Sequence, residues 1–263
     1  MNQQLRRKTA VEINDLDTEM PKPDPANLPE PLQINREVER QLIEDRSERY
    51  PHEPDHVFHP HLMGYCRRVM YNRKANLTYM DREVLGKVHM GTRHHCYLEH
   101  HIPRLHSDRT IETEIPVDRD VVVDGTRIAI KGTADVIDSR GVIYDHKFTG
   151  GLSWVRDEPK DTHVGQLHAY MYAADRRLGQ VEYVLRRGEV KKGEYIEHPV
   201  PWNPEIFKRS VERAVDVLEA LQSADEREGG RYNNPFSHCG CFYCKDENFV
   251  EAAKPYNEVL SGD

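Results

Sequence analysis

The sequence of 263 residues predicts an α/β domain built on a central mixed β-sheet flanked by helices. The order of the elements is the first observation. Helical patterns come first, a run of consecutive strands follows, and a helix, two strands and a long helix complete the domain. The second observation is that the consecutive strands are rich in Val and Ile and are separated by Gly, Asp and Ser turn residues. This order is typical of a sheet covered by helices.

The chain divides into three predicted segments. Residues 1–55 form an acidic, Pro-rich arm that we expect to be largely disordered, with one charged helix in QINREVERQLIEDRSERY. A compact domain is predicted for residues 56–250, and residues 251–263 form a C-terminal tail. Within the domain we expect helices at 60–76, 81–106, 161–178 (capped by Asp161) and 204–224, and strands at 110–123, 127–137, 142–148, 181–187 and 194–200.

Composition excludes some classes of protein. The apolar fraction is 37%, and no apolar run approaches the ~18 residues of a membrane span. The first residues lack the apolar stretch of a signal peptide, so we expect a cytoplasmic protein whose five cysteines are thiols or metal ligands. The net charge of −8 neither supports nor excludes a nucleic-acid partner.

Two carboxylates and an ammonium are expected at one end of a predicted hairpin. In GVIYDHKFTG, Asp145 and Lys147 share one face of a strand, whereas His146 points to the other. Asp135 lies near the end of the preceding strand, across a short turn. Two carboxylates this close repel unless a cation holds them, and oxygen ligands favour Mg²⁺ or Mn²⁺. Lys147 is placed to position or deprotonate a water; the alternative is a surface ion pair of little consequence.

The helix predicted for residues 81–106 adds an imidazole. His95 falls on the inward stripe of this helix. A single His on an apolar face is more often a hydrogen-bonded core residue, but beside a carboxylate pair it is a candidate ligand, since imidazole suits Mn²⁺ better than Mg²⁺. Gly91, one turn earlier, permits close approach of another backbone. The stripe consists of Val84, Val88, Gly91, His95, Leu98 and Ile102.

The helix predicted for residues 161–178 adds two polar groups. Gln166 and Tyr170 are one turn apart on a face that adjoins the apolar stripe. Both are suited to hydrogen-bond a phosphate or to orient Lys147. The expected apolar stripe consists of Val164, Leu167, Met171, Ala174 and Leu178.

Taken in order, the stretches GTRHH, GTADVID, YDHK and QLHAY resemble the motifs of RecB-type nucleases of the PD-(D/E)xK superfamily. That family shows G-x-x-x-H, then Asp, then (D/E)-x-K, then Q-x-x-x-Y, and the resemblance extends from about Tyr65 to Arg187. It implies a restriction-endonuclease-like core for the predicted domain. It also implies metal-dependent hydrolysis of DNA phosphodiesters.

The resemblance implies a role for each matched residue. His95, Asp135, Asp145 and the main-chain carbonyl of His146 would hold a catalytic Mg²⁺ or Mn²⁺. Lys147 would act on the attacking water, while Gln166 and Tyr170 would support the site and the DNA. The resemblance also implies a role for Glu114 as an outer-shell or second-metal carboxylate, although Glu112 is equally close in the sequence.

The cysteines suggest a second metal site. Some members of this family, including the CRISPR-associated spacer-acquisition nuclease and AddB-type nucleases, staple both ends of the domain with an iron–sulfur cluster. By resemblance, Cys66, Cys239, Cys241 and Cys244 would hold a 4Fe–4S cluster. The C-terminal spacing is C-x-C-x2-C rather than the C-x2-C-x5-C of the family. Zn²⁺, with His238 as a further ligand, is therefore the alternative. Cys96 is expected to be a buried thiol.

These expectations define the function classes to be compared. The first is a DNA exonuclease that acts on single strands or ends in repair, recombination or replication, together with protein partners of those processes. The second is a structure-specific or restriction-like endonuclease. The third is a non-catalytic nucleic-acid-binding subunit with structural metal sites. The sequence lacks a P-loop motif, so the chain is not itself a helicase.

Overall fold

The computed structural model describes residues 54–75, 91, 95, 100–101, 111–185, 195–224 and 233–241. All of them belong to one compact unit, Glu39–Asp263, and a separate unit comprises Met1–Val38. The predicted disordered arm and the C-terminal tail lie outside the described residues, apart from the last two residues of the arm.

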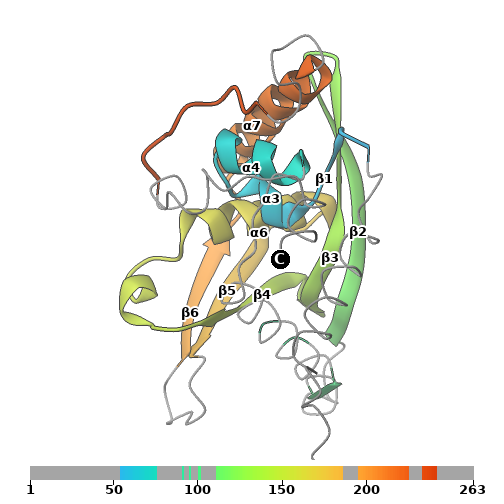
Figure 1. The fold of residues 1–263 in the computed structure, drawn as a ribbon. Coiled ribbons are helices and arrows are strands. Elements are labelled where there is room, and N and C mark those ends of the chain that lie inside the picture. Colours follow the sequence, from blue (N-terminus) through green and yellow to red (C-terminus); the bar gives the residue numbers. More distant parts are fainter. Residues whose placement is uncertain are drawn as a thin grey trace, which may run out of the picture. The chain divides into compact units, whose positions relative to one another are not determined.

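A mixed sheet forms the centre of the described unit, as predicted, and it has six strands rather than the five expected from the sequence (Figure 1). The strand order is β1-β3-β4-β5-β6, and β2 pairs with β3. The pairs β2–β3, β3–β4 and β5–β6 are antiparallel, whereas β1–β3 and β4–β5 are parallel. The strands are β1 (Val57–Phe58), β2 (Ile111–Val123), β3 (Thr126–Asp138), β4 (Val142–Thr149), β5 (Leu178–Leu185) and β6 (Tyr195–Pro201).

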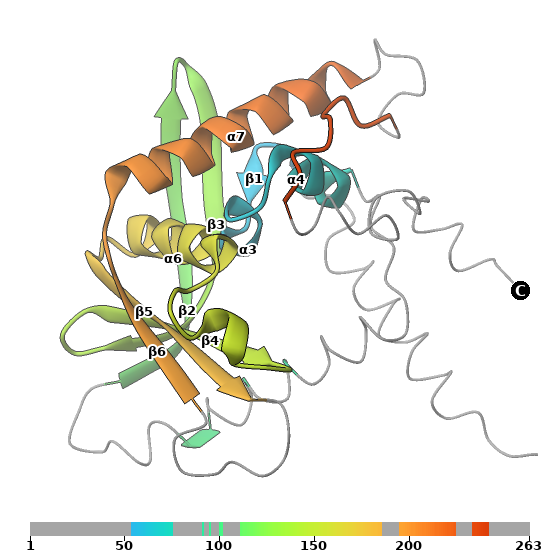
Figure 2. The ribbon, with the colours of Figure 1, turned by 90° about the vertical axis from the view of Figure 1, so that its left-hand side faces the viewer.

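Two helices form the main cover of the sheet (Figure 2). Helix α6 (Asp161–Ala173) packs on the face that carries Ile143 and Val181, and Leu167 fills the space above Gly179. Helix α7 (Pro204–Gln222) packs with α6 and the N-terminal helices around Phe58 and Met70. The remaining helices are α3 (Pro60–Met63), α4 (Arg67–Lys74) and the short 3₁₀ helix η3 (Ser153–Val155).

The helix predicted for residues 60–76 is wrong as a single helix, because the chain turns between α3 and α4. The cause is a close approach to α6. A Cβ atom on Gly64 would lie 1.8 Å from the carbonyl oxygen of Thr162, and one on Gly165 would lie 2.7 Å from the Cα of Gly64. Two glycines therefore allow α3 to touch the start of α6.

The extent predicted for the helix at residues 161–178 is also wrong. Helix α6 ends at Ala173, since Asp175 takes a φ of 54° and Leu178 already begins β5 with 42% of its surface exposed. Asp161 is the first helical residue, and the N-cap is Lys160, which has no side-chain capping bond. Helix α7 does have a capping side chain, because Asn203 accepts a hydrogen bond from the backbone N–H of Glu205.

The predicted helix at 81–106 lies largely outside the described residues. Its four described members, Gly91, His95, His100 and His101, are all helical. No helix in the described part of the chain has the length and apolar character needed to cross a membrane.

Candidate active site

A buried carboxylate, an ammonium and an amide meet where β4 passes beneath α6. Lys147 donates hydrogen bonds from Nζ to Oδ1 of Asp145 at 2.8 Å and to Oε1 of Gln166 at 3.0 Å. Gln166 in turn donates from Nε2 to the same Asp145 oxygen at 3.1 Å. Asp145 and Lys147 alternate with His146 along β4, so both face α6. The three predicted residues are therefore brought together.

Asp135 lies beside this group and has its own partners. Its Oδ2 accepts a hydrogen bond of 3.0 Å from the backbone N–H of His146, and its Oδ1 lies 3.3 Å from Nδ1 of His95. The side chain of Asp135 is 15% exposed and that of His95 is 31% exposed. The imidazole and the carboxylate predicted from separate motifs are therefore neighbours.

The structure decides between the two candidate glutamates. Glu114 offers a carboxylate oxygen within 4.8 Å of ligand atoms on His95 and Asp135, whereas Glu112 is not in that group. The β2–β3 register places Glu114 opposite Asp135, because the flanking pairs are Thr113 with Val136 and Ile115 with Ala134. Glu114 has a φ of 51°, a conformation that is strained for a side chain of this size.

The pKa values of these groups shift in opposite directions. Burial and the neighbouring Asp135 raise the pKa of Asp145, and Lys147 offsets only part of that effect. Burial alone would also raise the pKa of Asp135, but His95, Lys147 and the His146 N–H together bring it below its usual value. The hydrogen bond to Asp135 raises the pKa of His95 against the effect of burial. Asp145 is therefore the carboxylate whose charge is least compensated.

Tyr170 lies on α6 near the carboxylates of Asp135 and Asp145. The residue is buried, with 7% of its surface exposed. Burial and the nearby charges of Asp135 and Asp145 raise the pKa of this phenol far above its ordinary value, so it stays neutral.

This donor set fits a divalent cation. Oδ2 of Asp145 is buried and has no hydrogen-bond partner among the described residues. An unpaired buried carboxylate oxygen is costly unless a cation or a donor reaches it. His95, Glu114 and Asp135 have oxygen and nitrogen ligand atoms within 4.8 Å of one another; Asp145 is not a member of that group but lies close enough to Asp135 for the two charges to interact. Carboxylates with one imidazole suit Mg²⁺ or Mn²⁺.

His146 lies on the opposite face of the sheet, as predicted from strand alternation. Its side chain is buried, and Nδ1 lies 3.0 Å from a carboxylate oxygen of Glu182, its register partner on β5. Only the main chain of His146 faces the site, where its N–H holds Asp135. The role predicted for its carbonyl stays a prediction.

Two further histidines on α6 were not singled out from the sequence. His168 is fully buried; its Nδ1 lies 2.8 Å from the carbonyl oxygen of Val164, and its Nε2 accepts from the backbone N–H of Asn203. These partners require the neutral tautomer with the proton on Nδ1. Nδ1 of His163 lies 2.7 Å from the Tyr183 hydroxyl. The two histidines are five residues apart on one helix, and this spacing does not indicate the contacts of either one.

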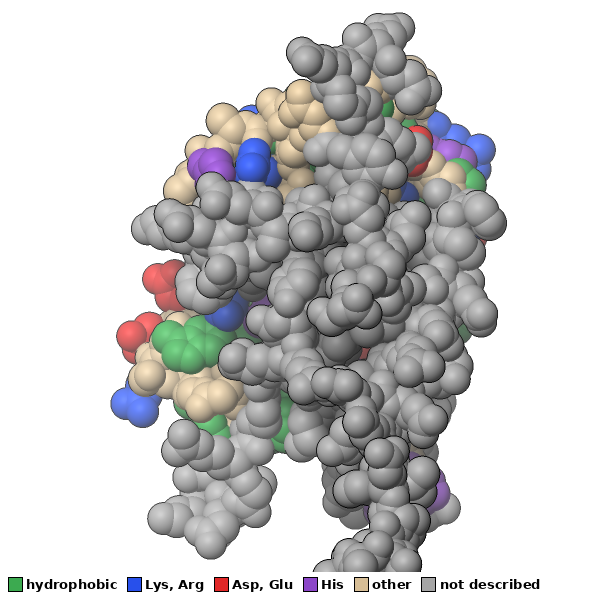
Figure 3. Space-filling view, viewed as in Figure 1, with side chains coloured by type: hydrophobic (Ala, Val, Ile, Leu, Met, Phe, Trp, Pro, Cys, Tyr) green, Lys and Arg blue, Asp and Glu red, His purple; other side chains and the backbone are tan. Residues whose placement is uncertain are grey.

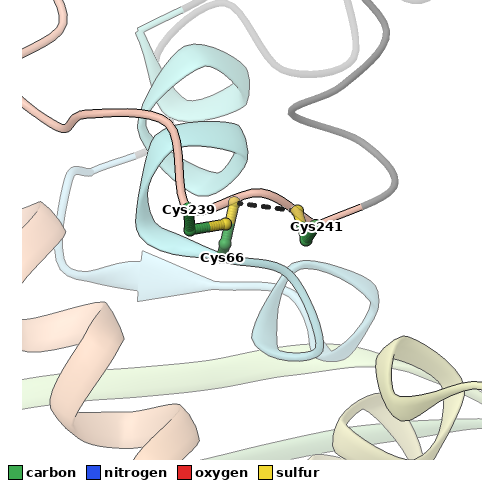
Figure 4. A group of neighbouring side chains, drawn as sticks. All are labelled: Cys66, Cys239 and Cys241. Carbon is green, nitrogen blue, oxygen red and sulfur yellow. Dashed lines mark hydrogen bonds between the residues drawn. The ribbon is translucent and has the colours of Figure 1, made fainter.

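Three cysteines from the two ends of the domain meet beside α4 (Figure 4). The thiol sulfurs of Cys66, Cys239 and Cys241 all lie within 4.8 Å of one another, and those of Cys66 and Cys241 are 3.8 Å apart. His238, the predicted alternative ligand, is not a member of this group. Cys244 and Cys96 lie outside the described residues.

Polar contacts independent of the thiols hold the C-terminal segment against α4. Arg68 donates from Nη1 to the carbonyl oxygen of Phe236 at 2.6 Å, and its own carbonyl accepts from Asn234 at 3.0 Å. Asn234 also donates to Asn72 at 2.5 Å, and the guanidinium of Arg67 lies 5.7 Å from the centre of the Phe236 ring. The meeting of the cysteines therefore follows from packing on both sides of them.

Comparison with known proteins agrees with this architecture. No curated protein sequence matches the chain. The solved structure of a protein called SSO0001 is 19% identical, covers 71% of this chain and 87% of its own, and superposes with a TM-score of 0.51, which shows a shared fold.

Two solved exonucleases superpose less well. An alkaline exonuclease from Laribacter hongkongensis is 12% identical, with 59% of this chain and 88% of its own covered at a TM-score of 0.39. A phage-related exonuclease from Haemophilus somnus is 14% identical, with coverages of 52% and 72% at a TM-score of 0.37.

The family comparison is the decisive one, because it extends over most of the chain. Residues 34–246 match the sequence profile of the PD-(D/E)XK nuclease superfamily, and this range includes every described element of the sheet and the whole carboxylate site. The chain therefore belongs to the PD-(D/E)XK nuclease superfamily.

Proposed function

We propose that this protein is a divalent-metal-dependent deoxyribonuclease, and specifically an exonuclease that acts on single-stranded DNA or on DNA ends. One observation carries the proposal: the Asp145 carboxylate is held by Lys147 and Gln166 on one oxygen, while its other oxygen is buried and unpaired beside Asp135. Superfamily membership supports hydrolysis as the reaction.

The metal would be held by His95, Glu114, Asp135, Asp145 and the main-chain carbonyl of His146. When bound, Mg²⁺ or Mn²⁺ supplies charge that polarises a phosphate and lowers the pKa of a water. The imidazole of His95 favours Mn²⁺ among these two. The N–H of His146 fixes the direction of the Asp135 carboxylate, so this ligand is oriented before any cation arrives.

Lys147 supplies the charge on the DNA side of the site. Its ammonium is held by two acceptors, Asp145 and Gln166, and its side chain remains 19% exposed. A fixed cation in this position orients the attacking water and offsets the negative charge that develops on the phosphate. Gln166, which is hydrogen-bonded to both Lys147 and Asp145, positions the two side chains together.

The exonuclease assignment and its biological setting rest on the resemblance to RecB-type nucleases. We propose a role in DNA repair, recombination or replication with protein partners of those processes, in the cytoplasm. The endonuclease and the non-catalytic subunit are the alternatives that the experiment below separates.

The experiment is metal-dependent degradation of labelled single-stranded DNA. The wild-type protein should degrade it with Mg²⁺ or Mn²⁺ and not with EDTA, and Lys147→Ala or Asp145→Ala should abolish degradation. Lys131→Ala is the matched control, because Lys131 pairs with Asp118 on the surface of the same sheet at 2.7 Å. Activity that survives both site variants would refute the assignment. Circular single strands set beside linear ones distinguish an endonuclease from an exonuclease.

The cysteine group is a second candidate metal site. We propose that Cys66, Cys239, Cys241 and Cys244 hold a 4Fe–4S cluster, as the resemblance implies. Zn²⁺ is the competing occupant, and one distance is compatible with it. Two thiolates on one tetrahedral Zn²⁺, with Zn–S bonds of about 2.3 Å, are separated by roughly 3.8 Å. The sulfurs of Cys66 and Cys241 are 3.8 Å apart.

A further inference from the structure

We propose that Trp154 stacks on an unpaired nucleobase of the substrate beside the carboxylate site, and so selects single-stranded DNA. This inference rests on the proposed nuclease function and adds a specificity residue that the catalytic motifs do not include. Trp154 lies in η3, in the connection between β4 and α6, and 49% of its surface is exposed.

The ring of Trp154 lies on the same face of the sheet as Lys147. Lys147 and Tyr183 are register partners on the adjacent parallel strands β4 and β5, so their side chains share a face. The Trp154 and Tyr183 rings meet edge to face with centroids 6.3 Å apart. His163 contacts the same Tyr183 ring, and the charge of Lys147 affects its pKa. Trp154 therefore contacts Tyr183, the residue that is the register partner of Lys147 on the neighbouring strand.

The exposed indole belongs to a well-anchored segment. Val155, the next residue, is completely buried, and its carbonyl accepts a hydrogen bond of 2.6 Å from Nε2 of His198. Thr149 and Gly151 are linked by a hydrogen bond of 3.0 Å at the start of the connection. Because its neighbours are fixed, the indole is held at the surface in one place and loses little freedom on binding.

A cation accompanies the ring. Nζ of Lys160 lies over one face of the Trp154 ring, 3.8 Å from its centroid, in a close cation–π contact, so a stacked base would use the opposite face. The same loop exposes Arg156, but also Asp157 and Glu158, which repel phosphates. In Figure 3 hydrophobic surface is visible between acidic and basic side chains where Figure 1 places this loop. This mixture suits contact with the flat face of a base better than contact with the sugar–phosphate chain.

Stacking on Trp154 requires a base whose face is free. In a duplex both faces of each internal base are covered by neighbouring base pairs, whereas every base of a single strand can present one. A fixed indole beside the catalytic lysine therefore favours unpaired nucleotides without favouring any sequence.

The test compares Trp154→Ala with Tyr195→Ala. Tyr195 is also an exposed aromatic residue, at 55%, but it pairs with Val184 and so lies on the opposite face from Lys147 and Tyr183. Binding of a fluorescein-labelled thymidine oligonucleotide is measured in EDTA, where the strand is not cut. We expect Trp154→Ala to weaken binding by about 5- to 100-fold and Trp154→Phe to retain most of it, whereas Tyr195→Ala changes little.

An oligonucleotide with abasic sites isolates the stacking contact. Wild-type protein and Trp154→Ala should bind it equally. The chain has two tryptophans, so in a Trp202→Phe variant the fluorescence comes from Trp154 alone. That fluorescence should be quenched by thymidine strands and not by the abasic oligonucleotide. Equal losses for the Trp154 and Tyr195 variants, or no loss for either, would overturn the inference. Failure of the nuclease proposal shows separately, as absence of metal-dependent cleavage by the wild-type protein whatever its binding.

Discussion

Nζ of Lys147 lies 2.8 Å from Oδ1 of Asp145, and Oδ2 of the same carboxylate is buried without a hydrogen-bond partner in the described part of the chain. Only one of the two carboxylate oxygens of Asp145 therefore has a hydrogen-bond partner among the described residues. An ion pair that served stability alone would use both oxygens of a buried carboxylate. The arrangement instead leaves one oxygen without a partner among the described residues, where the proposed cation would bind, and this asymmetry leads to the first prediction.

Asp145→Asn should separate activity from stability. The raised pKa of Asp145 means that burial and Asp135 disfavour its charge more than Lys147 favours it. A neutral amide of the same shape removes that cost. We expect the thermal midpoint in EDTA to equal or exceed that of the wild-type protein, while DNA cleavage falls by about 100-fold or more. Leu167→Ala, a core change, is the control that lowers the midpoint. A large loss of stability in Asp145→Asn would contradict the prediction.

Metal binding should strengthen as pH rises. The hydrogen bond to Asp135 raises the pKa of His95, and an imidazole must lose its proton before it binds a metal. The affinity for Mn²⁺, measured by titration calorimetry between pH ~6 and ~8, should therefore increase with pH by up to about tenfold per unit below that pKa.

The matched variants are His95→Gln and His100→Gln. His95→Gln should bind Mn²⁺ more weakly and with a flatter pH dependence, whereas His100→Gln, a change at an exposed residue, should keep the wild-type profile. The same steep profile in His95→Gln would rule out His95 as the titrating ligand.

Because of His163, the free energy of unfolding should decrease as the pH falls. Burial, together with the charges of Lys147 and Lys160, lowers the pKa of His163 to about 2. This histidine stays neutral in the fold but takes up a proton in the unfolded chain below about pH 6.5. Its contribution is thus complete above pH ~6.5 and declines below it, by up to about 1.4 kcal/mol per pH unit.

Urea unfolding at several pH values measures this effect. The free energy of unfolding of His163→Gln should fall less steeply between pH ~6.5 and ~5 than that of the wild-type protein. Equal slopes for the two proteins would show that the fold does not lower the pKa of His163.

Metal analysis of protein purified without oxygen should identify the occupant of the cysteine group. A 4Fe–4S cluster gives a brown protein that absorbs near ~400 nm, whereas zinc gives a colourless protein with one ion per chain. Cys66→Ser and Cys241→Ser should each lose the metal, and Cys96→Ser should retain it. Full metal content in the Cys66 and Cys241 variants would exclude this site.

Local patterns in the sequence predicted which side chains of the motifs share a face. Strand alternation is a property of two or three consecutive residues, so it correctly placed Asp145 and Lys147 on one face and His146 on the other. Five of the six strands were likewise predicted to within a few residues, whereas β1, which has only two residues, was not predicted. The interruption at Gly64 and the end of α6 were not, because close packing between α3 and α6 and the positive φ of Asp175 have no periodic signal.

The sequence by itself determined which side chains could form a metal site and which strand face they would share, because those features depend on neighbours in the chain. Only the tertiary structure decided that Glu114 rather than Glu112 joins Asp135, because that choice depends on the β2–β3 register. The same is true of Cys66 and Cys241, which are 175 residues apart and meet at 3.8 Å through packing. The burial that leaves one oxygen of Asp145 unpaired is likewise a product of the helix above it, since desolvation arises from atoms distant in the chain.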